Sequence, residues 1–197
     1  MLLKGKIALV TGGARGLGRA DALALAEAGA DVVIADILDA EKTVNDVQSM
    51  GRKSVAIKMD VTNVGEVKEG VEKIKKDFGS IDVLVNSAAT LDHLGQLLEQ
   101  KDKLWERDLR VNLTGTFNCS RAVWPFMQQK KWGRIINMAS VAGRSEASAK
   151  PVMPLPRPES SVSQSQWRWK GQDTESPAMW FARESSLQNL FSLSLLK

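Results

Sequence analysis

The sequence predicts an α/β fold with a doubly wound parallel sheet that is incomplete on its C-terminal side. Three observations support this prediction. Apolar runs alternate with amphipathic stretches up to about Gly143, a glycine-rich turn at residues 11–18 joins the first run to the first amphipathic stretch, and the alternation ends after Gly143. Strands that alternate with helices form a parallel sheet with right-handed crossovers, and the helices cover both of its faces.

The order of the elements follows from these patterns. Short apolar runs predict five strands, at residues 6–10, 32–35, 55–59, 81–85 and 134–138. Amphipathic stretches predict helices at residues 17–28, 40–50, 63–77 and 103–130. Small apolar residues in the first helix suit close packing on a sheet, namely Ala20, Leu23, Ala24, Ala26 and Ala28. Gly29 then provides a C-terminal stop.

The composition changes after Gly143. Five of the six prolines lie beyond residue 150, and Pro-Leu-Pro-Arg-Pro at 154–158 excludes a helix there. Serine-rich segments at 160–165 and 185–194 are typical of loops or disorder. No strand pattern is visible beyond Gly143. We therefore predict an aberrant, poorly ordered tail over residues 144–197, with a marginal helix at 187–196 as its one candidate element.

Composition and charge exclude several classes of function. The chain has 197 residues, of which 43% are hydrophobic and 25% charged, as in a single globular domain. Its net charge of +4 is not gathered into the basic stripe of a nucleic-acid-binding protein. The cluster Trp167-Arg168-Trp169-Lys170 could stack on RNA bases, but one such cluster is usually incidental. We expect no nucleic-acid partner.

The same survey predicts a cytoplasmic protein. A single cysteine, Cys119, cannot form an internal disulfide and fits a reducing compartment. The N-terminus lacks the apolar core of a signal peptide, and no apolar run is long enough to span a membrane. We expect no membrane partner. No cluster of cysteine and histidine predicts a metal site, and the only histidine, His93, has no predicted chemical role.

The glycine-rich turn is the strongest functional signal. It reads Thr11-Gly12-Gly13-Ala14-Arg15-Gly16-Leu17-Gly18, between the first apolar run and the first helical stretch. Free backbone N–H groups at such a helix start bind the pyrophosphate of a dinucleotide. The alternative is an ordinary strand–helix turn. We interpret residues 1–143 as a Rossmann-type dinucleotide-binding domain.

Asp36 refines the prediction of the cofactor. It ends the second predicted strand, 20 residues after Gly16, where a carboxylate accepts the ribose hydroxyls of an adenosine. A carboxylate also repels a 2′-phosphate, which favours NAD over NADP. Arg15 in the turn could favour that phosphate, so NADP stays open. The alternative for Asp36 is a solvated carboxylate at the end of a strand.

The spacing Thr-Gly-X-X-X-Gly-X-Gly resembles the short-chain dehydrogenase/reductase family, and four later stations of residues 4–143 match it. Asp60-Val61 resembles the family's contact with the adenine ring. Asn86-Ser87-Ala88-Ala89 stands in place of the family's Asn-Asn-Ala-Gly and departs from it at two positions. The resemblance implies that the cofactor is bound by Thr11, Gly12, Arg15, Gly16, Leu17, Gly18, Asp36, Asp60, Val61, Asn86 and Ala88.

Two further matches concern catalysis. Asn112 matches the helix asparagine that holds a water in the family's proton relay, and Ser140 matches the catalytic serine after the fifth strand. Alone, a serine at that place is more often a cap or turn residue. The resemblance implies an NAD(P)-dependent oxidoreductase that transfers hydride between nicotinamide and a small carbonyl or alcohol substrate. It also implies a homo-oligomer. The sequence around these motifs most resembles the branch of the family that contains 3-oxoacyl-carrier-protein reductases and 3-hydroxyacyl dehydrogenases.

The family's proton-transfer residues are missing from this chain. In the family, Tyr-X-X-X-Lys follows the serine: the tyrosine moves a proton to or from the substrate oxygen, and the lysine lowers its pKa and holds the nicotinamide ribose. This chain has no tyrosine, and residues 150–158 read Lys-Pro-Val-Met-Pro-Leu-Pro-Arg-Pro. Ser140 cannot act as the base because its hydroxyl lacks an activating neighbour. The second hypothesis is therefore a remnant that binds NAD without turnover.

A one-base slip near residue 144, in the gene or its record, would explain the loss. Suppose that the codons are read one base out of register, starting from the last base of the Val152 codon. That base and the first two bases of the Met153 codon then form one codon, and the last base of the Met153 codon and the first two of the Pro154 codon form the next, GCC. The two codons encode Tyr-Ala when the Val152 codon ends in T. Pro156-Arg157-Pro158 can supply Lys-Ala in that frame. We interpret the tail as frame-shifted or truncated, and a Val152 codon with another last base would rule this out.

Overall fold

The computed structural model describes residues 1–90, 99, 101–139 and 178–183. In this part of the chain six strands form one parallel sheet, ordered β3-β2-β1-β4-β5-β6. The strands are β1 (Ile7–Thr11), β2 (Asp31–Asp36), β3 (Ser54–Lys58), β4 (Val83–Asn86), β5 (Arg134–Ala139) and β6 (Ala178–Arg183). The helical segments are α1 (Gly16–Glu27), α2 (Glu41–Ser49), α3 (Val64–Phe78), α4 (Asp102–Asp108), η2 (Leu109–Gly115) and α5 (Thr116–Gln129).

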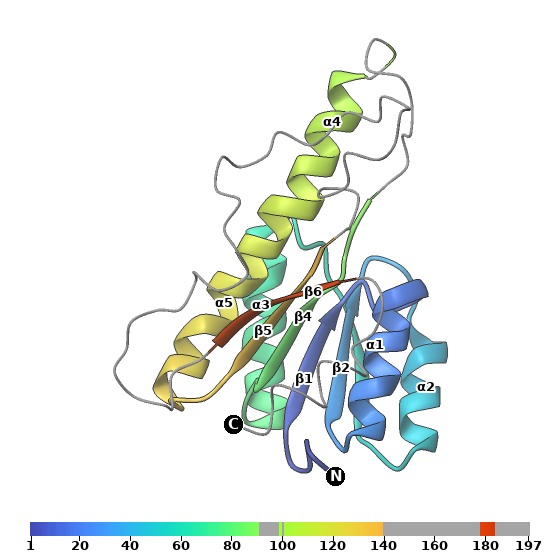
Figure 1. Ribbon diagram of the computed structural model, residues 1–197, viewed down its shortest axis with the longest axis vertical. Coiled ribbons are helices and arrows are strands. Elements are labelled where there is room, and N and C mark those ends of the chain that lie inside the picture. The colour runs from blue at the N-terminus through green and yellow to red at the C-terminus, as the bar shows by residue number, and fades with distance from the viewer. Residues whose placement is uncertain (91–98, 100, 140–177, 184–197) are drawn as a thin grey trace.

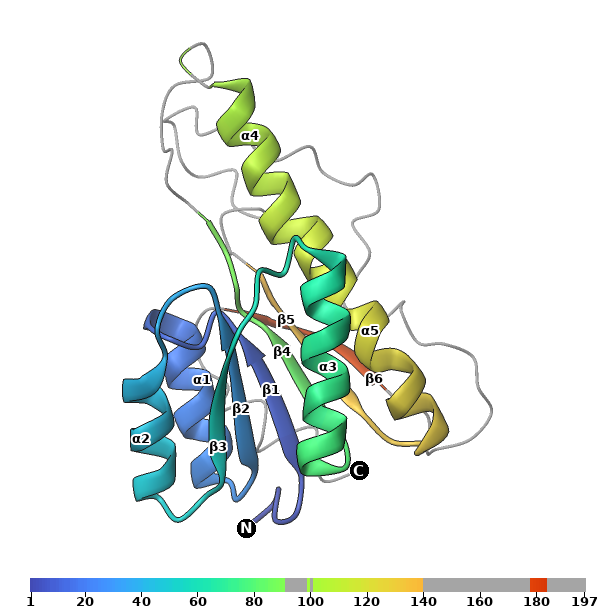
Figure 2. The same ribbon diagram turned by 180° about the vertical axis from the view of Figure 1, so that it is seen from behind.

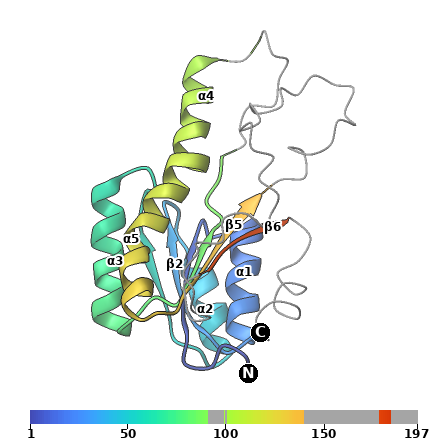
Figure 3. The same cartoon turned by 60° about the vertical axis from the view of Figure 1, so that its left-hand side comes forward.

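Helices cover both faces of this sheet, as Figure 3 shows, with α1 and α2 on one side and α3 and α5 on the other. Alternate residues of β1, β2, β4 and β5 enter opposite cores. Val10 belongs to the same core cluster as Leu25 of α1, whereas Leu9 belongs to the same core cluster as Val71 of α3. Because both faces are covered, the strands β1, β2 and β4 are continuous apolar runs rather than alternating ones. The predicted α/β architecture is confirmed.

The predicted helix at 103–130 is one long rod in the structure, but it is not uniform. Its three parts, α4, η2 and α5, follow one another without a break, and η2 has π-helical hydrogen bonding. Figures 1 and 2 show α4 projecting beyond the sheet, while α5 lies against it. No periodic pattern of apolar residues reveals the π-helical segment, which contains Asn112. In the described residues no helix is both long and apolar enough to cross a bilayer.

The prediction that no strand follows Gly143 is wrong at β6. Residues 178–183 pair in parallel with β5, in the register Arg134↔Ala178 to Ala139↔Arg183. Without β6 the backbone groups on that side of β5 would form an open edge, and pairing satisfies them. The segment was missed because Ala-Met-Trp-Phe-Ala-Arg lacks the β-branched residues typical of strands. The rest of the predicted tail, including the helix at 187–196, lies outside the described residues.

The predicted packing face of α1 needs a correction. Its buried residues are Gly18, Asp21, Ala22, Leu25 and Ala26, whereas Ala20 is exposed and Leu23, Ala24 and Ala28 are half-buried. Alanines occur on several sides of this helix, so their spacing is a weak guide to its orientation. Contact between Gly18 and the glycine turn orients the helix instead. An acidic residue, Asp21, therefore belongs to the buried face.

Asp82 connects the elements at the amino ends of the strands. It is fully buried, and its carboxylate accepts hydrogen bonds from the Ile7 backbone N–H (2.9 Å), the Ser80 hydroxyl (3.1 Å) and the Lys130 ammonium (2.5 Å). Its backbone also pairs with β1 and β5, through the Ile7 carbonyl and the Arg134 N–H. A single side chain thus fastens β1, β4 and the end of α5.

We predict that Asp82→Asn destabilises the chain by about 1.5–3 kcal/mol, because hydrogen bonds to a buried charge are lost. The measurement is the free energy of unfolding in urea. Asp77→Asn is the matched control, since Asp77 forms an exposed pair with Lys73. Surface pairs contribute little, so this change should stay within about 0.5 kcal/mol. Equal effects of the two variants would contradict the role given to Asp82.

Candidate dinucleotide site

The candidate site lies at the carboxyl ends of β1, β2 and β4. The chain passes from β1 to β2 and β3 on one side, and to β4, β5 and β6 on the other. This reversal of strand order between β1 and β4 is the place where ligands bind in open α/β sheets. The glycine turn follows β1 at this point, and the loop after β4 lies beside it.

Close backbone contacts shape the turn. Gly12 and Gly16 have φ values of +68° and +56°, which L side chains rarely adopt. A Cβ atom on Gly12 would lie 2.6 Å from Cα of Ala88, and one on Gly18 would overlap the carbonyl oxygen of Gly12. The turn, the first turn of α1 and the loop after β4 therefore meet without intervening side chains, and glycine at positions 12 and 18 allows it.

The amino end of α1 is open toward an anion. Arg15 precedes the helix in an extended conformation, its side chain makes no capping hydrogen bond, and the first turn has no acidic residue. The first N–H groups of a helix lack intrahelical partners and carry the positive end of its dipole. Arg15, Gly16 and Leu17 are exposed there. This geometry suits a phosphate or diphosphate group.

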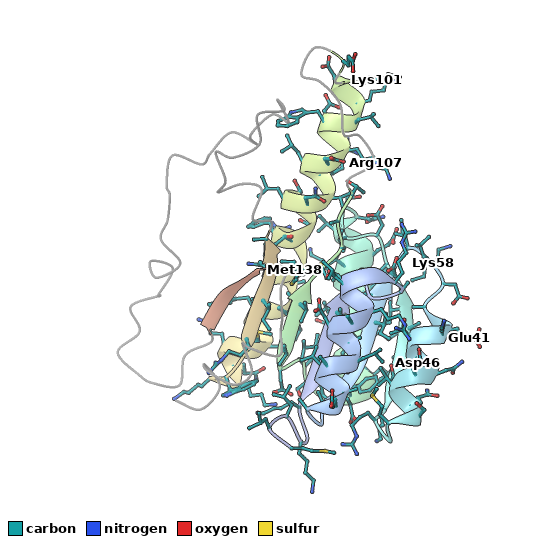
Figure 4. All side chains as sticks on the ribbon, turned by 45° about the vertical axis from the view of Figure 1, so that its right-hand side comes forward. Glu41, Asp46, Lys58, Lys101, Arg107 and Met138 are labelled. Carbon is teal, nitrogen blue, oxygen red and sulfur yellow. The ribbon has the colours of Figure 1, made fainter. Side chains whose placement is uncertain are left out.

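Asp36 attaches the turn to the end of β2. Its carboxylate accepts hydrogen bonds from the backbone N–H groups of Ala14 (2.9 Å) and Leu38 (3.0 Å). Two exposed apolar residues, Ile37 and Leu38, follow it. Across α1, Arg19 pairs with Asp46 of α2 at 2.5 Å. Figure 4 labels Glu41 and Asp46 on α2 and Lys58 at the end of β3, at this border of the molecule.

Two predicted cofactor contacts, Thr11 and Asn86, are buried and lie beneath the exposed rim of the site. The hydroxyl of Thr11 accepts hydrogen bonds from the N–H groups of Ser87 (3.2 Å) and Ala88 (3.3 Å). Asn86 donates to Asn137 (2.8 Å) of β5 and to Ser120 of α5. These side chains hold the loop that faces the glycine turn, so they shape the site from below.

The two residues predicted to contact the adenine ring, Asp60 and Val61, also differ in burial. The Asp60 carboxylate accepts from the Thr62 N–H, and its own N–H donates to Glu66. Val61 is buried in the core against α5, and its carbonyl accepts a hydrogen bond from Asn118. Asp60 is half-buried and nearer the surface than Val61.

Of the two predicted catalytic residues, Asn112 is the one that the structure describes. Asn112 is exposed on η2, and its amide both accepts from the Thr90 N–H (2.9 Å) and donates to the Thr90 carbonyl (3.1 Å). It thereby ties the loop after β4 to the long helix. Ser140 and His93 lie outside the described residues. Ser140 follows β5 directly, and Met138 near the end of that strand is labelled in Figure 4.

The sequence interpretation missed Asp21 and the function of Ser87. Asp21 is 6% exposed and bonded to the Ser87 side chain. Burial raises its pKa to about 6, against a smaller lowering by the Ser87 hydrogen bond. The available signal was an acidic residue between Gly18 and Leu25 on one helix face. Across the described ranges no three Asp, Glu, Cys or His side chains gather into a possible metal site.

Comparisons with known proteins agree with this geometry. A family model described as short chain dehydrogenase matches residues 6–152. The chain is 43% identical over 142 residues to the 3-oxoacyl-[acyl-carrier-protein] reductase FabG of Staphylococcus epidermidis, which covers 70% of this chain and 57% of that protein. It is 38% identical over 141 residues to the peroxisomal hydratase-dehydrogenase-epimerase of Neurospora crassa, covering 71% of this chain and 15% of the larger protein.

Solved structures agree as well. An NAD⁺-bound xylitol dehydrogenase superposes with a TM-score of 0.70 at 35% identity, over 72% of this chain and 55% of the other. A short-chain alcohol dehydrogenase described as putative, from Sinorhizobium meliloti, has the same TM-score at 30% identity. The chain spans little more than half the length of the FabG proteins that it matches, 57% in the case above.

We predict that Gly12→Ala destabilises the chain far more than Gly51→Ala. Both glycines have similar positive φ values, +68° and +73°, so alanine introduces similar strain, about 1–2 kcal/mol, at each. Only the Cβ at position 12 meets backbone, because the space around Gly51 is open. Overpacking should add about 1–3 kcal/mol at position 12. The measurement is urea unfolding, and equal losses would contradict the close contact with Ala88.

Proposed function

The chain belongs to the short chain dehydrogenase family, and we propose that residues 1–143 form its NAD-binding part. The observation that carries this proposal is the uncapped amino end of α1 beside a turn whose glycines leave room only for backbone. When bound, NAD supplies the hydride acceptor of the family's redox reaction. Arg15, Gly16 and Leu17 would contact its diphosphate, while Thr11, Gly12, Gly18, Asn86 and Ala88 shape the turn and the facing loop.

We propose NAD rather than NADP as the preferred cofactor. The Asp36 carboxylate is held in place by two backbone N–H groups at the end of β2. A fixed negative charge there accepts ribose hydroxyls and repels a 2′-phosphate. A structural relative with 35% identity was solved with NAD⁺ bound. Asp60 and the backbone at Val61 would lie along the adenine.

The reaction of the lineage is hydride transfer between nicotinamide and a carbonyl or hydroxyl group. The 43% identity to a 3-oxoacyl-[acyl-carrier-protein] reductase favours a 3-oxoacyl thioester as the ancestral substrate. In that reaction Ser140 would hydrogen-bond the substrate oxygen and Asn112 would support the proton relay. The chain has no tyrosine to move the proton. We therefore propose that this molecule binds NAD but turns over very slowly.

The cofactor preference can be tested at Asp36. We expect NADH to bind at least about tenfold more tightly than NADPH, and Asp36→Ala to reduce this ratio to about threefold or less, because the repulsive charge is gone. The measurement is a titration by nicotinamide fluorescence. Asp31→Ala removes the same charge from the other end of β2 and should leave the ratio unchanged. A ratio that Asp36→Ala does not alter would contradict the proposal.

The loss of turnover can be tested with the full chain. We expect ketone reduction by NADH to be slower than in a complete family member by about 10²–10⁴-fold or more, the usual contribution of general acid–base catalysis. We also expect Ser140→Ala to cause no further loss, since the serine works only together with the missing base. Steady-state assays with a panel of ketones and 3-oxoacyl thioesters provide the measurement. Activity within tenfold of the complete enzyme would contradict it.

A further inference from the structure

Asp21 is a buried acid that the proposed function does not use. It lies on the sheet-facing side of α1 with 6% of its surface exposed, and one carboxylate oxygen, Oδ2, has no hydrogen-bond partner. Its partner is the side chain of Ser87, in the loop after β4. An ionised carboxylate with an unpaired oxygen is costly in such a place. The pKa of Asp21 is accordingly raised to about 6 by burial.

The position of Asp21 places this charge close behind the diphosphate site. Asp21 is five residues beyond Gly16, where α1 begins, which is about 7.5 Å along the helix axis. Ser87 belongs to the loop that packs on Gly12 and is held by the Thr11 hydroxyl. Asp21 is buried, so negative charges at so short a separation repel each other more strongly than they would in water. A bound diphosphate therefore disfavours the ionised form of Asp21.

Four other charged residues around α1 are engaged elsewhere. The helix packs on β1, β2 and α2. Strand β1 carries no charged residue, and neither does the described loop from Ser87 to Thr90. Asp36 accepts two backbone N–H groups, Asp31 accepts the Lys53 N–H, and Arg19 pairs with Asp46. The remaining charged residues on these elements are Arg15, Glu27, Glu41 and Lys42. Within the described structure, no basic side chain pairs with Asp21 to keep it ionised.

We propose that dinucleotide binding to this chain is coupled to uptake of a proton by the Asp21 carboxyl group, with Ser87 setting the pH at which this occurs. The inference rests on the proposed function, because the ligand is the diphosphate of the cofactor. The protonated form binds more tightly, so affinity falls as the pH rises through and above the pKa of about 6. Uptake is largest just above that pH, where the free chain is ionised and the complex is protonated.

The test is isothermal titration calorimetry of the full chain with NAD⁺ between pH 5 and 8, at each pH in two buffers of different ionisation enthalpy. The difference between the two heats reports the protons taken up. We expect uptake with a maximum near pH 6.5, and a dissociation constant that rises about tenfold from pH 5 to 8. Asp21→Asn should abolish the uptake and hold the dissociation constant within about twofold across this range.

The Ser87→Ala variant tests the direction in which the pH of maximal proton uptake shifts. It removes the hydrogen bond that stabilises the ionised carboxylate, so the uptake maximum should move to higher pH. His93→Asn is the matched control, because it removes the only histidine and should leave the uptake unchanged. If Asp21→Asn does not fold, as judged by circular dichroism, the direction of the Ser87→Ala shift decides.

The possible failures are distinguishable. A chain that binds NAD⁺ at no pH in this range overturns the proposed function and this inference with it. Binding without proton uptake overturns the inference and leaves the proposed function standing. The same holds for uptake that persists in Asp21→Asn, disappears in His93→Asn, or moves to lower pH in Ser87→Ala.

Discussion

The contact of the glycine turn with the loop after β4 is the constraint on which the rest of the site depends. Gly12 touches the backbone of Ala88, and Gly18 touches the backbone of Gly12, so three segments meet where side chains would keep them apart. This contact orients α1 on the sheet, directs its free N–H groups outward, and brings Asp36 within hydrogen-bond distance of Ala14. The loop in turn is held from below by the Thr11 hydroxyl. The proposed cofactor site is thus shaped by backbone geometry, and buried side chains maintain that geometry.

The two ends of the strands are stabilised by different kinds of polar contact. At the amino ends, Asp82 is buried and accepts from three donors, which is how a buried charge becomes tolerable. At the carboxyl ends, Asn86 and Asp21 each keep one buried oxygen without a partner in the described structure. Native proteins leave few such atoms, and they are tolerated where function has a use for them. The amino ends also keep two buried polar atoms without a partner in the described structure, Ser54 Oγ and Arg134 Nε, so incomplete pairing occurs at both ends of the strands.

In the proposed function, the cofactor-binding residues all precede the end of β5. Up to Ala139 the chain contains the glycine turn, Asp36 and the loop after β4, which we propose as the dinucleotide site, and the family model extends only to residue 152. The residues that would move a proton belong beyond this point, and tyrosine occurs nowhere in the sequence. A sheet can form without them because the parallel pairing of β5 requires only a neighbouring strand, which β6 supplies. The sheet therefore forms through strand pairing that does not require the family's proton-transfer residues.

By itself the sequence determined the α/β architecture, the first five strands and the turn, because these depend on local apolar periodicity and on glycine spacing. It also identified Asp36 at the end of its strand. It could not determine which side of α1 is buried, since the alanines surround that helix and only the contact of Gly18 with Gly12 orients it. The pairing of Asp21 with Ser87 and the closure of Thr90 onto Asn112 join residues distant in the chain. Such contacts, like the pairing of β6 with β5, are decided by tertiary packing, because hydrogen bonds between remote segments leave no periodic trace in the sequence.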